Sequence, residues 1–157
     1  MTKYTDKFYR PAVGIMLINN YGKVFVGQRI NESLPSFQMP QGGIDKDETP
    51  LEAAFRELEE ETGVKNAELI AETKKWLKYE IPESFSSKKW MKKFKGQKQK
   101  WFLMRFTGED HEINIKKFEP EFSNWKWVEP SLLPEIIVDF KKNLYTEILS
   151  QFYSYLS

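Results

Sequence analysis

The stretch that decides the fold runs from Gly42 to Val64 and reads GGIDKDETPLEAAFRELEEETGV. Its second half carries three glutamates, Glu57, Glu60 and Glu61, at helical spacing. Like charges three or four residues apart repel one another and weaken an isolated helix. A carboxylate cluster of this kind beside an apolar stripe usually needs a counter-ion, and hard divalent cations prefer oxygen ligands. The stretch therefore indicates a metal-binding helix, with a solvated acidic face as the alternative.

The same stretch predicts the two ends of this helix, from about residue 50 to residue 62. Thr49 and Glu52 have the spacing of a capping box, and Gly63 supplies a C-terminal stop. At about 100° per residue, Arg56 falls on the outer side, where it is expected to pair with Glu52. The predicted core face comprises Leu51, Ala54, Phe55, Leu58 and Thr62, and the adjacent face carries Glu57, Glu60 and Glu61.

Length and composition limit the chemistry. The chain has 157 residues, of which 40% are hydrophobic, and we expect one folded domain over residues 1–157. It has no cysteine and a single histidine, His111, so thiolate or multi-histidine metal sites are excluded and any metal must be held mostly by oxygen. The N-terminal residues lack an apolar signal core, and no apolar run is long enough to span a bilayer. We therefore expect a cytoplasmic protein that does not bind membranes.

A net charge of +1 hides a segregation of charge along the chain. Residues 45–61 hold eight acidic residues, whereas residues 84–108 hold none. An acidic metal-binding centre beside a basic surface suits a polyanionic substrate. A solvated, mobile loop at 84–96 is the plainer interpretation of the lysine-rich part. The basic residues of the acid-free segment are Lys88, Lys89, Lys92, Lys93, Lys95, Lys98, Lys100 and Arg105.

The rest of the pattern predicts an α/β protein in which helices pack on a mixed β-sheet. Residues 139–155 have apolar side chains at four-residue steps and are expected to form an amphipathic C-terminal helix. Residues 31–43, with two prolines and a glycine pair, are expected to form a loop. Strands are predicted at 13–20, 24–29, 99–107 and 125–128, with one or two more within 67–81.

The pattern from Gly42 through Glu48 to Arg56-Glu57-Leu58-x-Glu60-Glu61-x-Gly63-Val64 resembles the Nudix box at each defining position. Flanking motifs resemble the branch that contains bacterial RNA pyrophosphohydrolases and (di)nucleoside polyphosphate hydrolases. The resemblance implies the Nudix fold, a mixed sheet sandwiched between helices (α-β-α). The flanking motifs are Tyr9-Arg10-Pro11, Pro40-Gln41-Gly42-Gly43, Gly96-Gln97-Lys98-Gln99-Lys100-Trp101, Pro120-Glu121-Phe122 and Trp125-x-Trp127-Val128.

The resemblance also implies a chemistry, the attack of water on phosphorus assisted by Mg²⁺ (or Mn²⁺) on oxygen ligands. Arg56 is implied to orient Glu57, and Glu48 to fix the entrance of the helix. Glu57 and Glu121 are alternatives for the general base, and a metal-bound hydroxide needs little help from either. The implied metal ligands are Glu57, Glu60, Glu61, Glu121 and a main-chain carbonyl near Gln41 and Gly42.

Contacts to a polyphosphate substrate follow from the same resemblance. The two arginines are expected to bind phosphates through forked hydrogen bonds, and the two lysines flank the strand that would line the cleft. Phe140 and Lys141 are expected to stack on and contact a base, although the apolar stripe of Phe140 also fits core packing. The predicted substrate-binding residues are Arg10, Arg29, Gln41, Lys98, Lys100, Phe140 and Lys141.

Two substrates fit this resemblance. The leading hypothesis is an RNA 5′-pyrophosphohydrolase, which removes pyrophosphate from 5′-triphosphorylated RNA, leaves a 5′-monophosphate and triggers decay. The alternative is a hydrolase that cleaves diadenosine polyphosphates asymmetrically to give ATP. The acid-free, lysine-rich segment favours RNA. A noncatalytic Nudix-fold module is a third hypothesis, which predicts gaps among carboxylates that are all present here. The sequence does not identify a protein partner.

Overall fold

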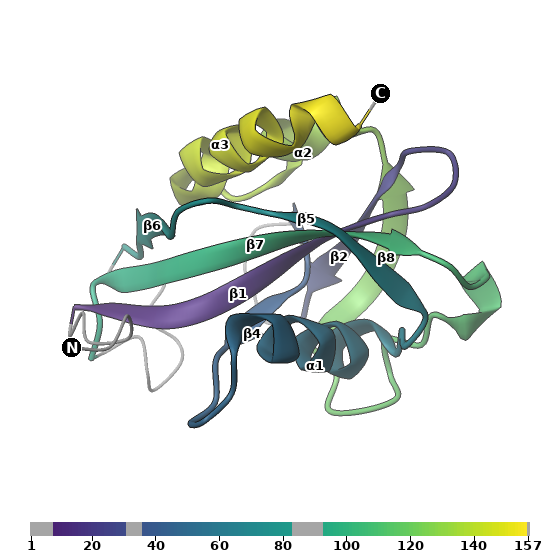
Figure 1. Cartoon of the computed structure of the whole chain (residues 1–157), viewed down its shortest axis with the longest axis horizontal. Helices are drawn as coiled ribbons and strands as arrows, with labels where there is room; N and C mark the ends of the chain where they lie inside the picture. Colours follow the sequence, from purple (N-terminus) through teal and green to yellow (C-terminus); the bar gives the residue numbers. More distant parts are fainter. Residues whose placement is uncertain (1–7, 31–35, 83–92, 157) are drawn as a thin grey trace.

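The computed structural model describes residues 8–30, 36–82 and 93–156. Within these residues a mixed eight-stranded sheet carries α1 (Pro50–Thr62) on one face and α2 (Leu133–Ile136) with α3 (Lys142–Phe152) on the other (Figure 1). This arrangement confirms the predicted α-β-α sandwich. The strands are β1 (Tyr9–Ile18), β2 (Val24–Arg29), β3 (Phe37–Gln38), β4 (Gln41–Gly43), β5 (Ala67–Glu72), β6 (Leu77–Glu80), β7 (Gly96–Phe106) and β8 (Phe122–Val128).

Two long central strands, β1 and β7, organise the sheet. They pair in parallel, from Tyr9 opposite Gly96 to Ile18 opposite Arg105. β1 pairs with β2 at its C-terminal end and with β4 nearer its N-terminal end, both antiparallel. The outer strands β5 and β6 pair with β7, and β3 and β8 pair with β2. Because β4 joins β1 at residues 12–14, it also packs against α1.

Alternation along β1 and β7 divides the apolar interior into two cores, one on each face of the sheet. The core on the α3 face includes Met16, Trp101 and Tyr145. The core on the α1 face includes Ile15 and Phe102. Neighbouring residues of β7 therefore face different helices. None of the helices in the described ranges is both long and apolar enough to cross a membrane.

The predicted bounds of α1 are confirmed. The side chain of Thr49 accepts a hydrogen bond from the Glu52 N–H at 3.1 Å, and the Glu52 carboxylate accepts one from the Thr49 N–H at 2.9 Å. At the other end Gly63 adopts φ 76°, in the left-handed region that glycine tolerates, and its N–H donates to the Glu59 carbonyl at 2.8 Å. Local capping signals thus fix the helix.

The buried face of α1 is rotated from the predicted one. Phe55, expected in the core, is 37% exposed, whereas Ala53 is fully buried and Glu61 is only 5% exposed. The reason is that α1 packs against β4 as well as β1. The side of the helix that faces residues 41–43 is therefore buried together with its apolar stripe.

Three other predicted segments are refined. The expected loop at 31–43 contains β3 and β4 in its described part, because long-range pairing with β2 and β1 makes strands of short polar stretches. The C-terminal segment is helical as predicted, as a 3₁₀ turn (Asp139–Lys141), α3 and a second 3₁₀ turn (Tyr153–Tyr155). Of the expected basic loop at 84–96, residues 84–92 lie outside the described residues, with Lys88, Lys89 and Lys92 among them.

Candidate functional site

The carboxylate of Glu57 lies against the backbone of Gly42, where α1 meets β4. A Cβ atom on residue 42 would overlap this carboxylate, so only glycine allows so close an approach. The Glu57 side chain is 13% exposed. Its burial, reinforced by the charge of Glu60, raises the pKa of Glu57 to about 7 from an ordinary value of 4.5. The helix thus holds a carboxylate where ionisation is disfavoured.

A second buried carboxylate, that of Glu61, lies one helical turn further along. Its Oε1 accepts a hydrogen bond from the backbone N–H of Gln41 at 3.0 Å. Burial, together with the charge of Glu57, raises the pKa of Glu61 to about 8. Both carboxyl groups resist ionisation in the absence of an added positive charge. A bound divalent cation would favour their ionised forms, and hard cations of this kind prefer oxygen ligands. The residues present therefore fit such a cation.

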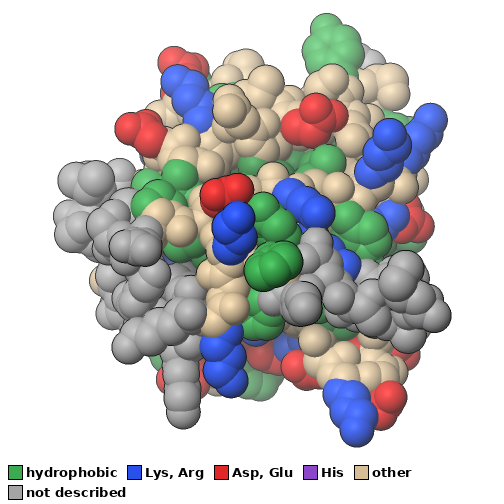
Figure 2. Space-filling model, turned by 90° about the vertical axis from the view of Figure 1, so that its left-hand side faces the viewer, with side chains coloured by type: hydrophobic (Ala, Val, Ile, Leu, Met, Phe, Trp, Pro, Cys, Tyr) green, Lys and Arg blue, Asp and Glu red, His purple; other side chains and the backbone are tan. Residues whose placement is uncertain are grey.

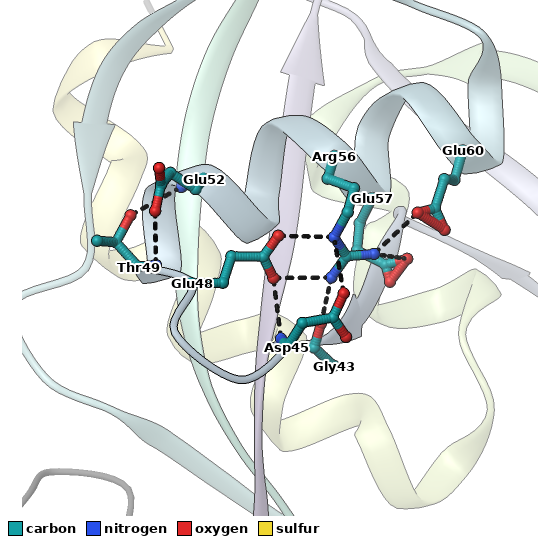
Figure 3. Close-up of polar contacts among 8 residues, drawn as sticks. All are labelled: Gly43, Asp45, Glu48, Thr49, Glu52, Arg56, Glu57 and Glu60. Atoms are coloured by element: carbon teal, nitrogen blue, oxygen red, sulfur yellow. Dashed lines mark hydrogen bonds and ion pairs between the residues drawn. The ribbon is translucent and has the colours of Figure 1, made fainter.

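Arg56 ties this part of α1 to the loop before it and to β4 (Figure 3). Its guanidinium donates to both carboxylate oxygens of Glu48, at 2.7 and 2.9 Å, and to the Gly43 carbonyl at 2.8 Å. It also donates to Glu60 at 2.9 Å and lies 3.5 Å from the Glu57 carboxylate. The hydrogen bonds to Glu48 and Glu60, with the charge of Glu57, raise the pKa of Arg56 above its ordinary value. Arg56 thus lies within ion-pair distance of Glu57, the residue that it is predicted to orient.

The predicted pairing of Arg56 with Glu52 is replaced by its pairing with Glu48. Glu52 accepts from the Thr49 N–H, which completes the capping box. Glu48 is held in place because it also accepts from the Asp45 N–H at 2.9 Å, and its hydrogen bond to Arg56 lowers its pKa. A carboxylate fixed in this way binds both arms of the guanidinium with little further loss of side-chain freedom.

The two other predicted metal ligands are bound to arginines. Glu60 pairs with Arg56, and Glu121, just before β8, pairs with Arg29 at the end of β2 at 3.1 Å. Within residues 8–30, 36–82 and 93–156, no three Asp, Glu or His side chains converge closely enough to hold a metal ion. All four carboxylates are close enough to interact electrostatically, since the charge of Glu60 raises the pKa of Glu57 and the charges of Glu57 and Glu121 raise that of Glu61.

Polar side chains on the α3 face of the sheet lie beside the α1–β4 junction, since Arg10 interacts electrostatically with Glu57. The guanidinium of Arg10 lies over Gly43, where a Cβ atom would collide with it, and burial lowers the pKa of Arg10. The side chain of Gln41 accepts a hydrogen bond from Gln99 at 2.8 Å, and Gln97 accepts one from the Tyr79 hydroxyl at 2.9 Å. The sequence prediction missed Gln97, Gln99 and Tyr79. The alternation of residues 97–100 is the signal that could have identified the two glutamines.

The intervening lysines of β7 project toward the opposite face of the sheet. Lys98 is 7% exposed, with its ammonium 5.3 Å from the centre of the Trp76 ring. Lys100 donates to the Thr73 carbonyl at 2.6 Å and pairs with Glu72 at 3.4 Å. Both lysines are therefore on the face of the sheet away from Gln41. Figure 2 shows the end of the molecule where β1 and β7 begin, and basic and hydrophobic side chains are interspersed there.

Phe140 and Lys141 lie in the 3₁₀ turn before α3. The Phe140 ring is 6.1 Å from that of Tyr79 and lines a cavity of about 630 Å³. Lys141 is 5% exposed, with its ammonium 5.2 Å from the Tyr79 ring centre and 3.4 Å from Oε1 of Gln38. A largely apolar cavity with a few polar groups suits a planar base. Its lining includes Gln28, Phe37, Lys126, Ile137 and Val138.

Comparison with known proteins agrees with this fold. The sequence matches the NUDIX domain over residues 8–148, and the chain therefore belongs to the Nudix family.

Among curated proteins it is similar to an RNA pyrophosphohydrolase of Roseobacter denitrificans, 51% identical over 150 residues that make up 94% of each chain. Another RNA pyrophosphohydrolase, from Rickettsia prowazekii, is 47% identical over 97% of this chain and 94% of the relative.

Two solved structures share the fold at low sequence identity. A C. elegans Ap4A hydrolase in a binary complex superposes with a TM-score of 0.65 at 19% identity, covering 91% of this chain and 98% of that one. The E. coli dihydroneopterin triphosphate pyrophosphohydrolase superposes with a TM-score of 0.69 at 18% identity, covering 90% and 97%.

Proposed function

We propose that this protein is an RNA pyrophosphohydrolase that removes pyrophosphate from the 5′-triphosphate end of RNA, leaves a 5′-monophosphate and so starts decay. The observation that carries the chemistry is the α1–β4 junction, where two buried carboxylates of raised pKa meet the backbone of β4. The choice of RNA is supported by relatives of that name, which match nearly the whole chain at about half its positions.

The proposed cofactor is Mg²⁺, with Mn²⁺ as a substitute, because both prefer oxygen donors. Glu57 and Glu61 are its proposed central ligands, joined by the Gly42 carbonyl. Glu60 and Glu121, which pair with arginines in this structure, would be its further ligands. The ion would neutralise phosphate oxygens and lower the pKa of a bound water.

The protein's own groups hold the substrate and move the proton. Arg10 and Arg29 are proposed to bind phosphates, Arg10 above Gly43 and Arg29 beside Glu121. Glu57 and Glu121 stay alternatives for the base that accepts a proton from the attacking water. Phe140 is proposed to stack on a base in the cavity that its ring lines.

The alternative substrate is a diadenosine polyphosphate, and the cavity of about 630 Å³ has room for a base of either compound. The experiment compares kcat/KM for a short 5′-triphosphorylated RNA with kcat/KM for diadenosine tetraphosphate, with Mg²⁺ present. We expect RNA to be preferred by at least about tenfold. Turnover of the dinucleotide with the RNA left intact would establish the alternative instead. A cytoplasmic location and a single domain over residues 1–157 stay predictions.

A further inference from the structure

A hydrogen-bonded chain of side-chain amides crosses the sheet on its α3 face. The indole N–H of Trp101 donates to Oε1 of Gln99 at 2.8 Å. Nε2 of Gln99 in turn donates to Oε1 of Gln41 and to Oε1 of Gln97, at 2.8 Å in each case. The Tyr79 hydroxyl donates to the same oxygen of Gln97 at 2.9 Å. Three amides are therefore linked through one central residue.

Small residues on β1 make this crossing possible. Gly14 lies opposite both Gln41 and Trp101, and a Cβ atom on Gly14 would overlap the indole ring. Ala12 lies opposite Gln99, and its side chain is too short to separate Gln99 from Gln41. The side chains of β4 and β7 can therefore meet above the strand that lies between them.

The direction of every amide in this chain follows from Trp101. An indole N–H can donate a hydrogen bond and cannot accept one, whereas a glutamine amide does both. Gln99 must therefore present its oxygen to Trp101 and its nitrogen to its two neighbours. Gln41 and Gln97 must then present their oxygens to Gln99, which turns both Nε2 groups away from the network.

These two outward nitrogens are left for a ligand. No described residue accepts a hydrogen bond from Nε2 of Gln41 or of Gln97. The Gln41 side chain is partly exposed, and within the described residues Gln38 Nε2, not an amide of this network, is a buried side-chain nitrogen without a partner. The Gln97 side chain is otherwise enclosed, with the residue only 1% exposed. Both amide donors therefore have fixed directions, one on the partly exposed Gln41 and one on the enclosed Gln97.

The donors lie beside Arg10 and near the carboxylates of α1. Arg10 is opposite Gln97 across the β1–β7 pairing and interacts electrostatically with Tyr79 and Glu57. Gln41 is linked to the carboxylates through its own backbone N–H, which binds Glu61. Donors next to an arginine bind anionic oxygens well, because charge-assisted hydrogen bonds are stronger than neutral ones.

We propose that Trp101 sets the polarity of this amide network so that Gln41 and Gln97 offer N–H donors to phosphate oxygens of the substrate. The inference rests on the proposed function, because that function supplies the polyphosphate. Trp101 and Gln99 act through the two outer glutamines and are positioning residues. Gln41 and Gln97 make the contact.

Gln99→Glu tests the network with little change in volume. The carboxylate still accepts from Trp101 but cannot donate, so Gln41 and Gln97 turn their nitrogens inward and lose their outward donors. We expect KM for 5′-triphosphorylated RNA to rise roughly ten- to hundredfold, with a smaller change in kcat. The control is Gln151→Glu, the same charge change on α3, which should leave both constants unaltered. An unaltered KM in a folded Gln99→Glu protein would overturn the proposal.

A second measurement does not depend on turnover. In ¹⁵N-labelled wild-type protein with Mg²⁺, the side-chain amide signals of Gln41 and Gln97, assigned through single Gln→Glu variants, are followed during titration with inorganic tripolyphosphate. Both pairs are expected to shift, while the Gln151 pair stays in place. If they shift in a protein that hydrolyses no RNA, the network stands and the proposed function fails. A titration to saturation that leaves both pairs unmoved overturns the network, whatever the activity.

Discussion

The acidic helix α1 and the basic strand β7 were both conspicuous as runs of charge, and the fold uses them in opposite ways. In α1 the carboxylates of Glu57 and Glu61 are buried where their pKa values rise to about 7 and about 8. In β7, Lys100 is bound to the Thr73 carbonyl and to Glu72. A charge that the folded protein disfavours indicates a missing ligand, whereas a charge with good partners indicates structure.

The largest effect expected from this contrast is on catalysis by α1. Glu57→Gln keeps the shape of the side chain and removes a metal ligand that is also a candidate base. We expect kcat/KM on triphosphorylated RNA to fall by roughly three to five orders of magnitude. The fold should persist, because Gln removes a charge that burial disfavours. Steady-state kinetics and circular dichroism measure the two outcomes.

The matched control is Glu59→Gln on the same helix. Glu59 points to Lys65 and Lys117, at 3.6 and 4.0 Å, away from Gly42. Its substitution should change kcat/KM by less than about twofold, as for other surface ion pairs. Near-normal turnover by Glu57→Gln would contradict the assignment of the site.

The next effect is on stability as a function of pH. A carboxyl whose pKa is raised in the folded protein holds a proton that the unfolded chain releases above pH 4.5. The stabilisation is therefore complete below that pH and is lost as pH rises through about 7 and 8. For metal-free protein, urea titrations from pH 5 to 9 should show the free energy of unfolding falling by on the order of 7 kcal/mol.

Two comparisons isolate the cause of this slope. Glu61→Gln should reduce it, because the amide does not titrate and only the contribution of Glu57 is left. Saturating Mg²⁺ should flatten it, because a bound cation favours the ionised carboxylates. A slope that is the same in wild type, in Glu61→Gln and with Mg²⁺ would mean that other groups cause it.

How much could be predicted from sequence depended on whether the determining contacts were local. Thr49, Glu52 and Gly63 fixed the ends of α1, because capping involves residues a few positions apart. The buried side of α1 was misjudged at Phe55, because it depends on β4, whose strand character comes from pairing with β1. Local sequence does not contain that pairing.

The candidate site shows the same difference between local and long-range contacts. The box carboxylates were recognisable from their spacing, and the structure does place Glu57 and Glu61 together. On β7 the sequence offers Gln97 and Gln99 or Lys98 and Lys100 as the residues facing Gln41, and charge favoured the lysines. Only the register of β7 with β1 shows that the glutamines share the face of Gln41.

The smallest expected effect concerns Lys100, and it tests the basic half of the contrast. Lys100→Met keeps the apolar stem but leaves the Thr73 carbonyl without its donor. We expect the free energy of unfolding to fall by about 1 kcal/mol, because the carbonyl loses one hydrogen bond and Glu72 is half exposed.

The same variant should leave kcat/KM on triphosphorylated RNA within about twofold of wild type, since the Lys100 ammonium is engaged away from Gln41. Denaturation curves and initial rates on one preparation give both values. A rise in KM with stability unchanged would restore Lys100 as a substrate contact, as its sequence motif predicts. That result would also show that charge type outweighs strand register in assigning roles along β7.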